Sequence, residues 1–252
     1  MKRSDVVIYS CVTAGFDKVE TIPEDFPFRC ILFTDNQSIN VNGWEIHYID
    51  SKYKSPVQIN RDLKIRMHPI LKEYNKSIYV DGNVIIKDKS IELINKLLQL
   101  DCDIGLNLHP RFTNVYEDLF EIFRVGIVKG YKVIPVLKNC IDLGIKLTDP
   151  FYECNIIFRR HNEKIDILMD DWWDFFSKGT GRDQAAFVMA VKKNSMKVHN
   201  IAVEDIRKKN NPYFFVKKHE TNKNLYKRLM VRLLSELTLT RILFKYYMRN
   251  VS

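Results

Sequence analysis

The sequence lacks several features that define common protein classes. It contains no apolar run long enough to span a bilayer. It also contains no G-x-G-x-x-G and no G-x-x-x-x-G-K-[ST] motif, so neither a dinucleotide-binding fold nor a P-loop is supported. The chain passes from Met-Lys-Arg-Ser-Asp directly into an apolar segment, and we therefore expect no signal peptide.

The cysteines do not form the pattern of a disulfide framework. There are five of them, an odd number, and they are scattered along the chain and mostly placed in apolar runs. This pattern predicts buried free thiols in a reducing compartment, and it argues against both a disulfide-rich scaffold and a zinc site.

The composition is that of an ordinary soluble globular protein. The chain has 252 residues, of which 46% are hydrophobic and 28% are charged, enough for one large domain with a full core. The net charge of +9 is unevenly distributed, because Lys217 to Arg249 holds nine Lys and Arg against two acidic residues, a net +7. The basic character therefore belongs to the tail, and we expect no nucleic acid as a partner of the whole chain.

Apolar runs alternate with amphipathic segments along the chain. The predicted strands are 6–11, 30–36, 44–49, 77–80, 84–86, 103–108 and 155–158, and the predicted helices are 60–74, 90–100, 114–130, 165–176 and 185–192. Pro69 should kink or break the first of these helices. This alternation predicts an α/β fold with a mostly parallel central sheet and helices on both faces.

The tripeptide Asp81-Gly82-Asn83 follows one of the buried strands. A carboxylate at such a position is costly unless it is paired, hydrogen-bonded or bound to a cation. Gly82 lets the backbone turn tightly, and the oxygens of Asp81 and Asn83 suit a hard cation such as Mg²⁺ or Mn²⁺ that holds a diphosphate. The alternative is a β-hairpin, for which Asp-Gly between apolar runs is a strong signal.

Basic residues lie on the helix that precedes this tripeptide. Arg61, Lys64 and His68 fall on one face, which is either a solvated face or a face directed at a phosphate.

Together these segments resemble a known enzyme family. The Asp81 triplet with its preceding basic helix resembles the metal-binding core of nucleotide-sugar glycosyltransferases of the GT-A type. The segment 152–158, the Trp-containing helix and Arg182-Asp183-Gln184 resemble the second half of the retaining family of bacterial galactosyltransferases and glycogenin. More closely, Val6 to His219 resembles a glycosyltransferase-like family formerly described as a domain of unknown function, with plant members tied to seed mucilage and bacterial members in surface-polysaccharide loci. Its marks here are Val80-Asp81-Gly82, His109-Pro110-Arg111 with Val115-Tyr116-Glu117, Arg160-His161 and Arg182-Asp183-Gln184.

This resemblance implies a function and a set of site residues. It implies a single GT-A, Rossmann-like domain over 1–216 that transfers a sugar from a nucleotide diphosphate sugar to a glycan or lipid-linked acceptor, with retention favoured, in surface polysaccharide synthesis. The implied catalytic residues are Asp183, Gln184 and Glu117. The implied nucleotide- and sugar-binding residues are Thr13, Ala14, Thr34, Asp35, Arg61, Lys64, Asp81, Gly82, His109, Arg111, Asn155, Arg160 and Arg182. The implied ligands of a divalent cation, Mn²⁺ or Mg²⁺, are Asp81, Asn83 and His219, with His199 as the second choice for the histidine.

The sequence also departs from the pattern and leaves alternatives open. Asn83 replaces the second acid of the usual Asp-x-Asp, which weakens metal binding, and the closing His-x-x-Gly-x-x-Lys-Pro-Trp motif is absent. Asp183 could be a helix N-cap, Glu117 could lie on a solvated helix face, and Trp172 and Trp173 suit a core. The competing functions are a metal-dependent phosphatase or nucleotidyltransferase that uses Asp81, and a basic nucleic-acid-binding protein.

The tail, residues 217–252, is predicted to form a basic amphipathic helix. From Asn222 to Arg249 it contains no Pro or Gly, and Tyr226, Leu229, Leu233, Leu237, Phe244 and Tyr247/Met248 recur at near-helical spacing. Such a helix suits an anionic membrane surface, and predicts a cytoplasmic protein at the inner face of the cell membrane. The alternative is that the helix packs on the domain or on a second subunit, as in a homodimer.

Overall fold

The computed structural model describes residues 5–50, 55–201, 203–217, 230 and 239–249. Within the chain, contacts define two compact units. Unit 1 comprises residues 1–107, 154–167 and 198–221, and unit 2 comprises 108–153, 168–197 and 222–252. The division into a domain of 1–216 and a tail of 217–252 stays a prediction.

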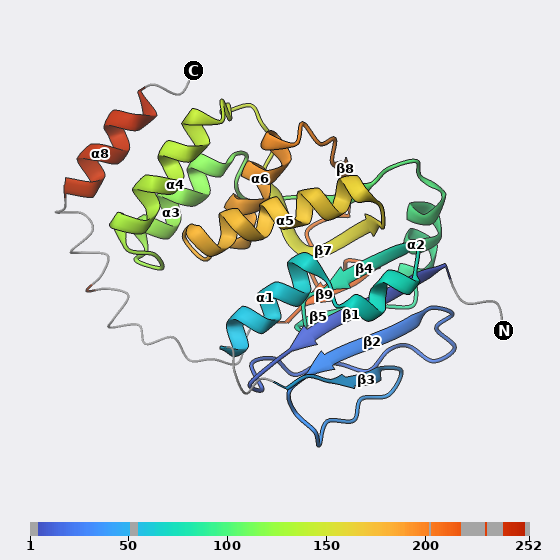
Figure 1. Ribbon diagram of the computed structural model, residues 1–252. Helices are drawn as coiled ribbons and strands as arrows, with labels where there is room; N and C mark the ends of the chain where they lie inside the picture. The colour runs from blue at the N-terminus through green and yellow to red at the C-terminus, as the bar shows by residue number, and fades with distance from the viewer. Residues whose placement is uncertain (1–4, 51–54, 202, 218–229, 231–238, 250–252) are drawn as a thin grey trace. The chain divides into compact units, whose positions relative to one another are not determined.

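A mixed, mostly parallel sheet of seven strands forms the centre of the fold, in the order β3-β2-β1-β4-β7-β6-β8 (Figure 1). The strands are β1 (Val6–Val12), β2 (Arg29–Thr34), β3 (Glu45–Tyr48), β4 (Lys76–Val80), β6 (Ile104–Leu108), β7 (Tyr152–Arg160) and β8 (His199–Asn200). β1, β2, β3 and β4 run parallel to one another, β7 runs antiparallel to β4, and β8 runs parallel to β6. The predicted α/β class with a mostly parallel sheet is therefore confirmed.

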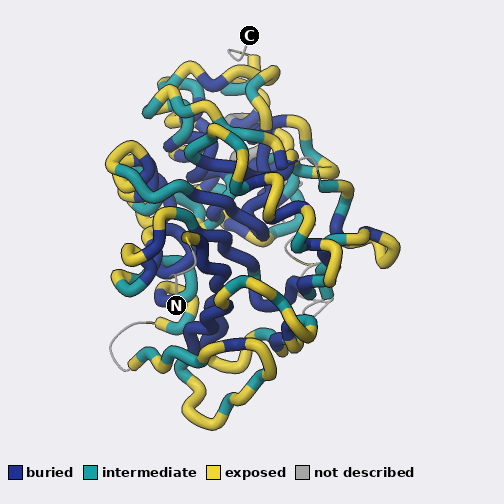
Figure 2. The backbone as a smooth tube through the Cα atoms, turned by 90° about the vertical axis from the view of Figure 1, so that its right-hand side faces the viewer, coloured by how far each residue is buried: buried dark blue, intermediate teal, exposed yellow. Residues whose placement is uncertain are grey.

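The sheet of unit 1 is buried because its strands are apolar on both faces. Every residue of β1 is buried, and Figure 2 shows the interior strands in dark blue between exposed, yellow loops. Ile8 and Ile78 pack in one cluster with Ile94 of α2 (Ser90–Gln99). Tyr9, whose side chain points to the other face, packs edge-on against Tyr79 and donates a hydrogen bond to the carbonyl of Leu63. Strands without a polar face are typical of a parallel sheet with helices on both sides.

The predicted helix 60–74 is two helices. The first, α1 (Pro56–Arg66), begins at Ser55, whose side chain accepts a hydrogen bond from the Gln58 amide. It ends at Met67, which has a positive φ of 64°. The 3₁₀ helix η1 (Pro69–Glu73) follows, so the break predicted at Pro69 is present, and the proline starts the second helix because it needs no amide donor there.

The hairpin alternative for Asp81-Gly82-Asn83 is wrong. The amide of Val84 does donate to the Asp81 carbonyl at 2.9 Å, as in a tight turn. However, β5 (Val84–Ile86) leaves the main sheet and pairs antiparallel with β9 (Phe214–Val216), far along the chain. The tripeptide therefore connects two sheets, because the apolar run after it finds its partner in a distant segment.

Unit 2 is largely helical. The predicted helix 114–130 is shorter, since α3 (Val115–Arg124) ends before Gly126, whose φ is +70°. It is followed by α4 (Gly130–Asp142), a helix that the sequence analysis missed and that contains Pro135. Next come α5 (Glu163–Lys178), which begins in unit 1, and α6 (Asp183–Lys193).

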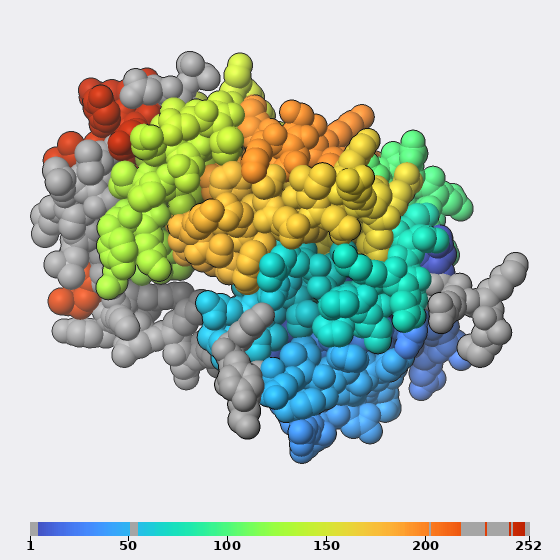
Figure 3. All heavy atoms as spheres, viewed as in Figure 1, coloured from blue at the N-terminus to red at the C-terminus, as the bar shows by residue number. Residues whose placement is uncertain are grey.

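The tail helix is described only in part. Most of the predicted span 222–249 lies outside the described residues, and the structure gives α8 (Leu239–Met248). In Figures 1 and 3, α8 (red) lies beside α3 and α4 (yellow-green). Phe244 is only 4% exposed, and its ring centroid lies 5.3 Å from that of Phe120. Phe244 therefore belongs to the packing of unit 2, although the sequence pattern placed it on a lipid-facing side.

No helix within the described part of the chain is long and apolar enough to cross a membrane.

Candidate functional site

In unit 1, several predicted site residues lie just beyond the carboxyl ends of neighbouring parallel strands. Thr13 and Ala14 follow β1, Asp35 follows β2 and Asp81 follows β4. The Ala14 amide donates to both carboxylate oxygens of Asp35, at 2.9 and 3.1 Å. The Thr13 hydroxyl donates to the Pro56 carbonyl at 2.8 Å. The carboxyl ends of β1, β2 and β4 therefore share one edge of the sheet, the usual place for a ligand in α/β proteins.

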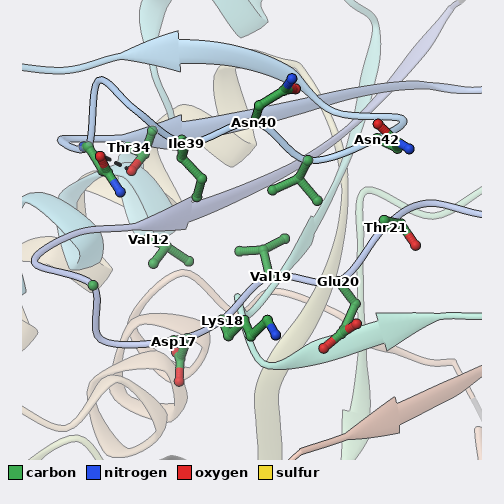
Figure 4. Close-up of a pocket in the computed structure, with 13 residues that line it drawn as sticks. Val12, Asp17, Lys18, Val19, Glu20, Thr21, Thr34, Ile39, Asn40 and Asn42 are labelled. Carbon is green, nitrogen blue, oxygen red and sulfur yellow. Dashed lines mark hydrogen bonds between the residues drawn. The ribbon is translucent and has the colours of Figure 1, made fainter.

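A cavity of about 540 Å³ opens at this edge. It is lined by Val12, Gly15, Asp17, Lys18, Val19, Glu20, Thr21, Thr34, Asn36, Ile39, Asn40, Val41 and Asn42. Figure 4 shows the apolar side chains of Val12, Val19 and Ile39 converging, with Asp17, Lys18 and Glu20 along one side. An apolar interior with polar groups at its border is the usual composition of a small-molecule site.

Gly82 brings the Asp81 turn against the wall of this cavity. A Cβ added at Gly82 would lie 2.2 Å from Val12 Cγ2 and 3.5 Å from Asp17 Cβ, and both of these residues line the cavity. No side chain fits there without a shift of the wall. The glycine thus has a packing reason in addition to the turn.

Asp81 is paired with a buried lysine. Lys64 Nζ lies 2.9 Å from Asp81 Oδ1, and the side chains are 2% and 28% exposed, respectively. The Tyr79 hydroxyl donates to the same oxygen at 2.9 Å, and Lys64 Nζ lies 5.3 Å from the centroid of the Tyr79 ring. Burial raises the pKa of Tyr79 well above its usual value, and the charge of Asp81 raises it further, while the charge of Arg61 opposes both. Tyr79 therefore stays protonated and acts as a donor.

Arg159 is a second buried cation, and the sequence analysis missed it. Its guanidinium donates to the Tyr9 hydroxyl and to the Lys64 carbonyl, both at 2.5 Å. The predicted binding residue was its neighbour Arg160, which instead pairs with Asp101 at 2.9 Å. Every residue of β7 from Tyr152 to Arg159 is buried, so the alternation of strand faces does not separate Arg159 from Arg160.

Asn155 offers an acceptor next to Asp81. The Asp81 amide donates to the Asn155 carbonyl at 2.9 Å, which fixes the end of β4 against β7. The side-chain Oδ1 of Asn155 is buried and makes no hydrogen bond to any described residue. An unsatisfied buried acceptor costs free energy, and a ligand that donates a hydrogen bond would recover it.

The described residues do not fit a divalent-cation site at Asp81. Asn83 Nδ2 donates to the Lys217 carbonyl at 2.8 Å and the Lys217 amide donates to the Asn83 carbonyl at 2.9 Å, so Asn83 fastens the segment after β9. Lys217 in turn forms an ion pair with Glu20. His219 lies outside the described residues, His199 lies in β8, and no group of three or more His, Cys, Asp or Glu in the described ranges is placed to hold a metal. The carboxylate of Asp81 is already neutralised by Lys64.

In unit 2, Arg182 joins two side chains of the predicted site region. Its guanidinium donates to Asp118 Oδ1 at 3.2 Å and to Gln184 Oε1 at 2.8 Å. Asp118 is buried, and burial raises the pKa of its carboxyl although the charge of Arg182 lowers it. Asp118 was missed, although the buried positions Val115, Leu119 and Ile122 place it on the buried face of α3.

Asp183 begins α6 but is not its N-cap. The N-cap residue is Arg182, and Asp183 Oδ1 accepts a hydrogen bond from the Gln184 amide at 3.1 Å. Its carbonyl accepts one from Trp172 Nε1 at 2.8 Å. Trp172 is fully buried against Phe187, so the interpretation of Trp172 as a core residue is confirmed.

The other predicted residues of unit 2 make local contacts. His109 Nδ1 accepts hydrogen bonds from the amides of Arg111 and Phe112, at 3.2 and 2.9 Å. The exposed Arg111 pairs with Glu121. Glu117 accepts bonds from the Thr113 amide at 2.8 Å and hydroxyl at 3.0 Å, and so caps the start of α3. Their predicted roles in binding and catalysis stay predictions.

Comparisons with known proteins find a distant structural likeness. No protein-family model matches the sequence, and no curated protein matches it. Among solved structures, the apo form of mouse xyloside xylosyltransferase 1 is similar, with 13% sequence identity and a TM-score of 0.48, over 77% of this chain and 83% of that chain. A likeness of this degree assigns no role to any residue here.

Proposed function

We propose that this chain is a glycosyltransferase that takes a sugar from a nucleotide diphosphate sugar and transfers it to a hydroxyl of a glycan or lipid-linked acceptor. The observation that supports this proposal is the cavity of unit 1, which borders the Asp81-Gly82-Asn83 turn. The motif resemblance of Asp81 and of Arg182-Asp183-Gln184 supports it independently.

The cavity has the size and composition for a nucleoside. Its volume of about 540 Å³ falls within the range of small-molecule sites. The apolar groups of Val12, Val19 and Ile39 suit a base or the flat face of a ribose, and Asn40 and Asn42 supply hydrogen-bonding groups at the border. In the proposal the nucleoside occupies this cavity and the diphosphate extends toward Asp81.

The reaction breaks the bond between the anomeric carbon and a phosphate oxygen. The departing nucleoside diphosphate carries the bonding electrons, and positive charge near it lowers the barrier. Lys64 and Arg61 on α1 are the basic groups that we assign to this task. The acceptor oxygen forms the new bond to the anomeric carbon and gives its proton to a phosphate oxygen of the departing nucleoside diphosphate. The roles of Asp183 at the sugar hydroxyls and of Gln184 below the anomeric carbon, with retention of configuration, stay part of the proposal.

A binding and transfer panel tests this function. UDP, GDP and their sugars, a single-stranded nucleic acid and a phosphate ester are compared by thermal shift, and sugar transfer to glycan acceptors is then followed by mass spectrometry. We expect stabilisation by a nucleoside diphosphate and none by nucleic acid. Hydrolysis of the phosphate ester without sugar transfer would instead indicate a phosphatase that uses Asp81.

We further propose that the basic tail brings the enzyme to anionic lipids, where a lipid-linked acceptor would lie. In α8, Ile242 and Tyr246 are exposed one turn apart, next to the exposed Lys245 and Arg249. The full chain should float with anionic but not neutral vesicles, and a chain ending at Glu220 should not. Equal behaviour of the two chains would remove the membrane from the proposal.

A further inference from the structure

We infer that the buried ammonium group of Lys64 takes the place of a divalent cation at Asp81, so that this chain binds the diphosphate of its donor without a metal. The inference rests on the proposed function, because it concerns how the same site binds the nucleotide. It departs from the divalent cation that the motif resemblance implies.

The first step is that the carboxylate is already occupied. Lys64 Nζ lies 2.9 Å from Asp81 Oδ1, and the Tyr79 hydroxyl donates to the same oxygen. Lys64 is 2% exposed and lies on α1, which is anchored to the sheet by the bonds of Tyr9 and Arg159 to its carbonyls. A lysine buried to this degree needs a nearby acid, because an isolated ammonium is very costly to remove from water. A metal ion at Asp81 Oδ1 would bring a second positive charge against the buried ammonium of Lys64.

The second step is the charge of the cluster. Lys64 and Arg159 are both buried cations, linked through the Lys64 carbonyl, and Asp81 pairs with Lys64. These three side chains carry a formal charge of +1. Arg61, one turn earlier on the same helix, adds further positive charge at Tyr79. Affinity for Mg²⁺ or Mn²⁺ rises with the number of acidic ligands, whereas a cationic cluster attracts a diphosphate directly.

The third step concerns the second ligand of the motif. An amide at Asn83 brings no charge, and its Nδ2 is bonded to the Lys217 carbonyl at 2.8 Å. Asn83 is thus a positioning residue that connects the turn to β9. Asp81 is 28% exposed, so its second oxygen can accept a hydrogen bond from a donor sugar while the first stays with Lys64.

The first test measures nucleotide binding with and without metal. UDP and GDP are titrated by thermal shift and by calorimetry, in EDTA and in Mn²⁺, with the full chain. We expect equal dissociation constants in the two conditions. Binding that appears only with Mn²⁺ would overturn the inference and leave the proposed function standing. Binding in neither condition would overturn the proposed function itself.

The second test removes the ammonium. Lys64→Met should weaken nucleotide binding in EDTA on the order of 10- to 100-fold, the range for a lost charge-assisted hydrogen bond. The matched control is Arg66→Met, which removes one positive charge from the same helix at an exposed ion pair with Asp62. A folded Lys64→Met protein with unchanged affinity would contradict the inference. If Lys64→Met fails to fold, Lys64→Met/Asp81→Leu removes both charges at once and takes its place, with the same expected loss.

The third test detects metal directly and needs no activity. Free Mn²⁺ is measured by its magnetic resonance signal in the presence of wild-type and Asp81→Asn protein. We expect the two proteins to bind Mn²⁺ to the same extent. An Mn²⁺ ion that wild type binds and Asp81→Asn loses would show that Asp81 is a metal ligand and would overturn the inference.

Discussion

Unit 1 and unit 2 each contain a carboxylate paired with a cation, but the burial of the two partners is reversed. At Asp81 the cation is hidden, since Lys64 is 2% exposed, and the carboxylate is 28% exposed. At Asp118 the carboxylate is hidden, at 1%, and Arg182 is 33% exposed. The more exposed group is therefore a carboxylate in unit 1, and in unit 2 it is a guanidinium that donates to the Gln184 side chain.

This reversal shows which side chain of each ion pair lies at the surface and can contact a ligand directly. The buried member of each pair compensates the charge of the other and acts through its own charge at short range, and the exposed member keeps hydrogen-bonding capacity at the surface. The sequence alone does not show which member of an ion pair is buried, and so it does not distinguish the pair in unit 1 from the pair in unit 2. Variants that remove one residue of each ion pair at a time test this comparison.

The largest effect should come from removing each acid. Asp81→Leu removes the acid that pairs with the buried Lys64, and we expect a loss of about 3–5 kcal/mol in the free energy of unfolding. Asp118→Leu should cost only about 1 kcal/mol, because the released Arg182 can reach water. Urea unfolding of the two variants measures this difference. Equal losses would show that the burial of the partner does not set the cost.

The next effect concerns turnover. Asp81→Asn keeps an oxygen acceptor but removes the charge, and we expect sugar transfer to fall about 100-fold or more if the carboxylate acts in the transition state. Asp183→Asn should have a similar effect. Asp88→Asn is the control, since this exposed carboxylate lies in the same chain segment and should leave turnover unchanged. Full activity of a folded Asp81→Asn protein would contradict the role of Asp81 in sugar transfer.

A smaller effect is expected at the wall of the cavity. Gly82→Ala places a Cβ 2.2 Å from Val12 Cγ2, so that the wall must move. The expected cost is about 1–3 kcal/mol of stability, with weaker nucleotide binding. Gly144→Ala in unit 2 has the strain of a φ of +67° but meets no atom within 4 Å, and should leave nucleotide binding intact. Calorimetry with UDP and GDP compares the two variants.

The smallest effect is a dependence of stability on pH. Burial lowers the pKa of His68 and of His161, both in unit 1. The unfolded chain then binds more protons, so their contribution to stability is complete above the unfolded pKa of about 6.5 and is lost as the pH falls through the lower folded values. Asp118 acts in the opposite sense, because its raised pKa makes its contribution fall as the pH rises.

The double variant His68→Gln/His161→Gln should therefore flatten the fall in melting temperature between pH 7 and pH 5. An unchanged slope would mean that these imidazoles do not titrate differently in the folded and unfolded chain.

Much of the fold could be predicted from local patterns. The apolar runs of the sequence predicted β1, β2, β4 and β6, because a buried parallel strand needs apolar residues on both faces. The helix α4 was missed, since Gly130 at its start and Pro135 inside it are signals against a helix that tertiary packing of Val133 and Leu137 overrides. The hairpin interpretation of Asp81-Gly82 was wrong, because β5 pairs with the distant strand β9.

By itself, the sequence determined the α/β class and the position of Asp81, Asp35 and Thr13 at strand ends, because these depend on the order of residues along the chain. Only the tertiary structure decided which groups these residues meet. Lys64 reaches Asp81 across 17 positions of the chain, and Arg159 reaches the Lys64 carbonyl across 95. Local periodicity contains no information on such pairs, because side chains meet through the packing of a helix on a sheet. The ion pair of Lys64 with Asp81 depends on that packing.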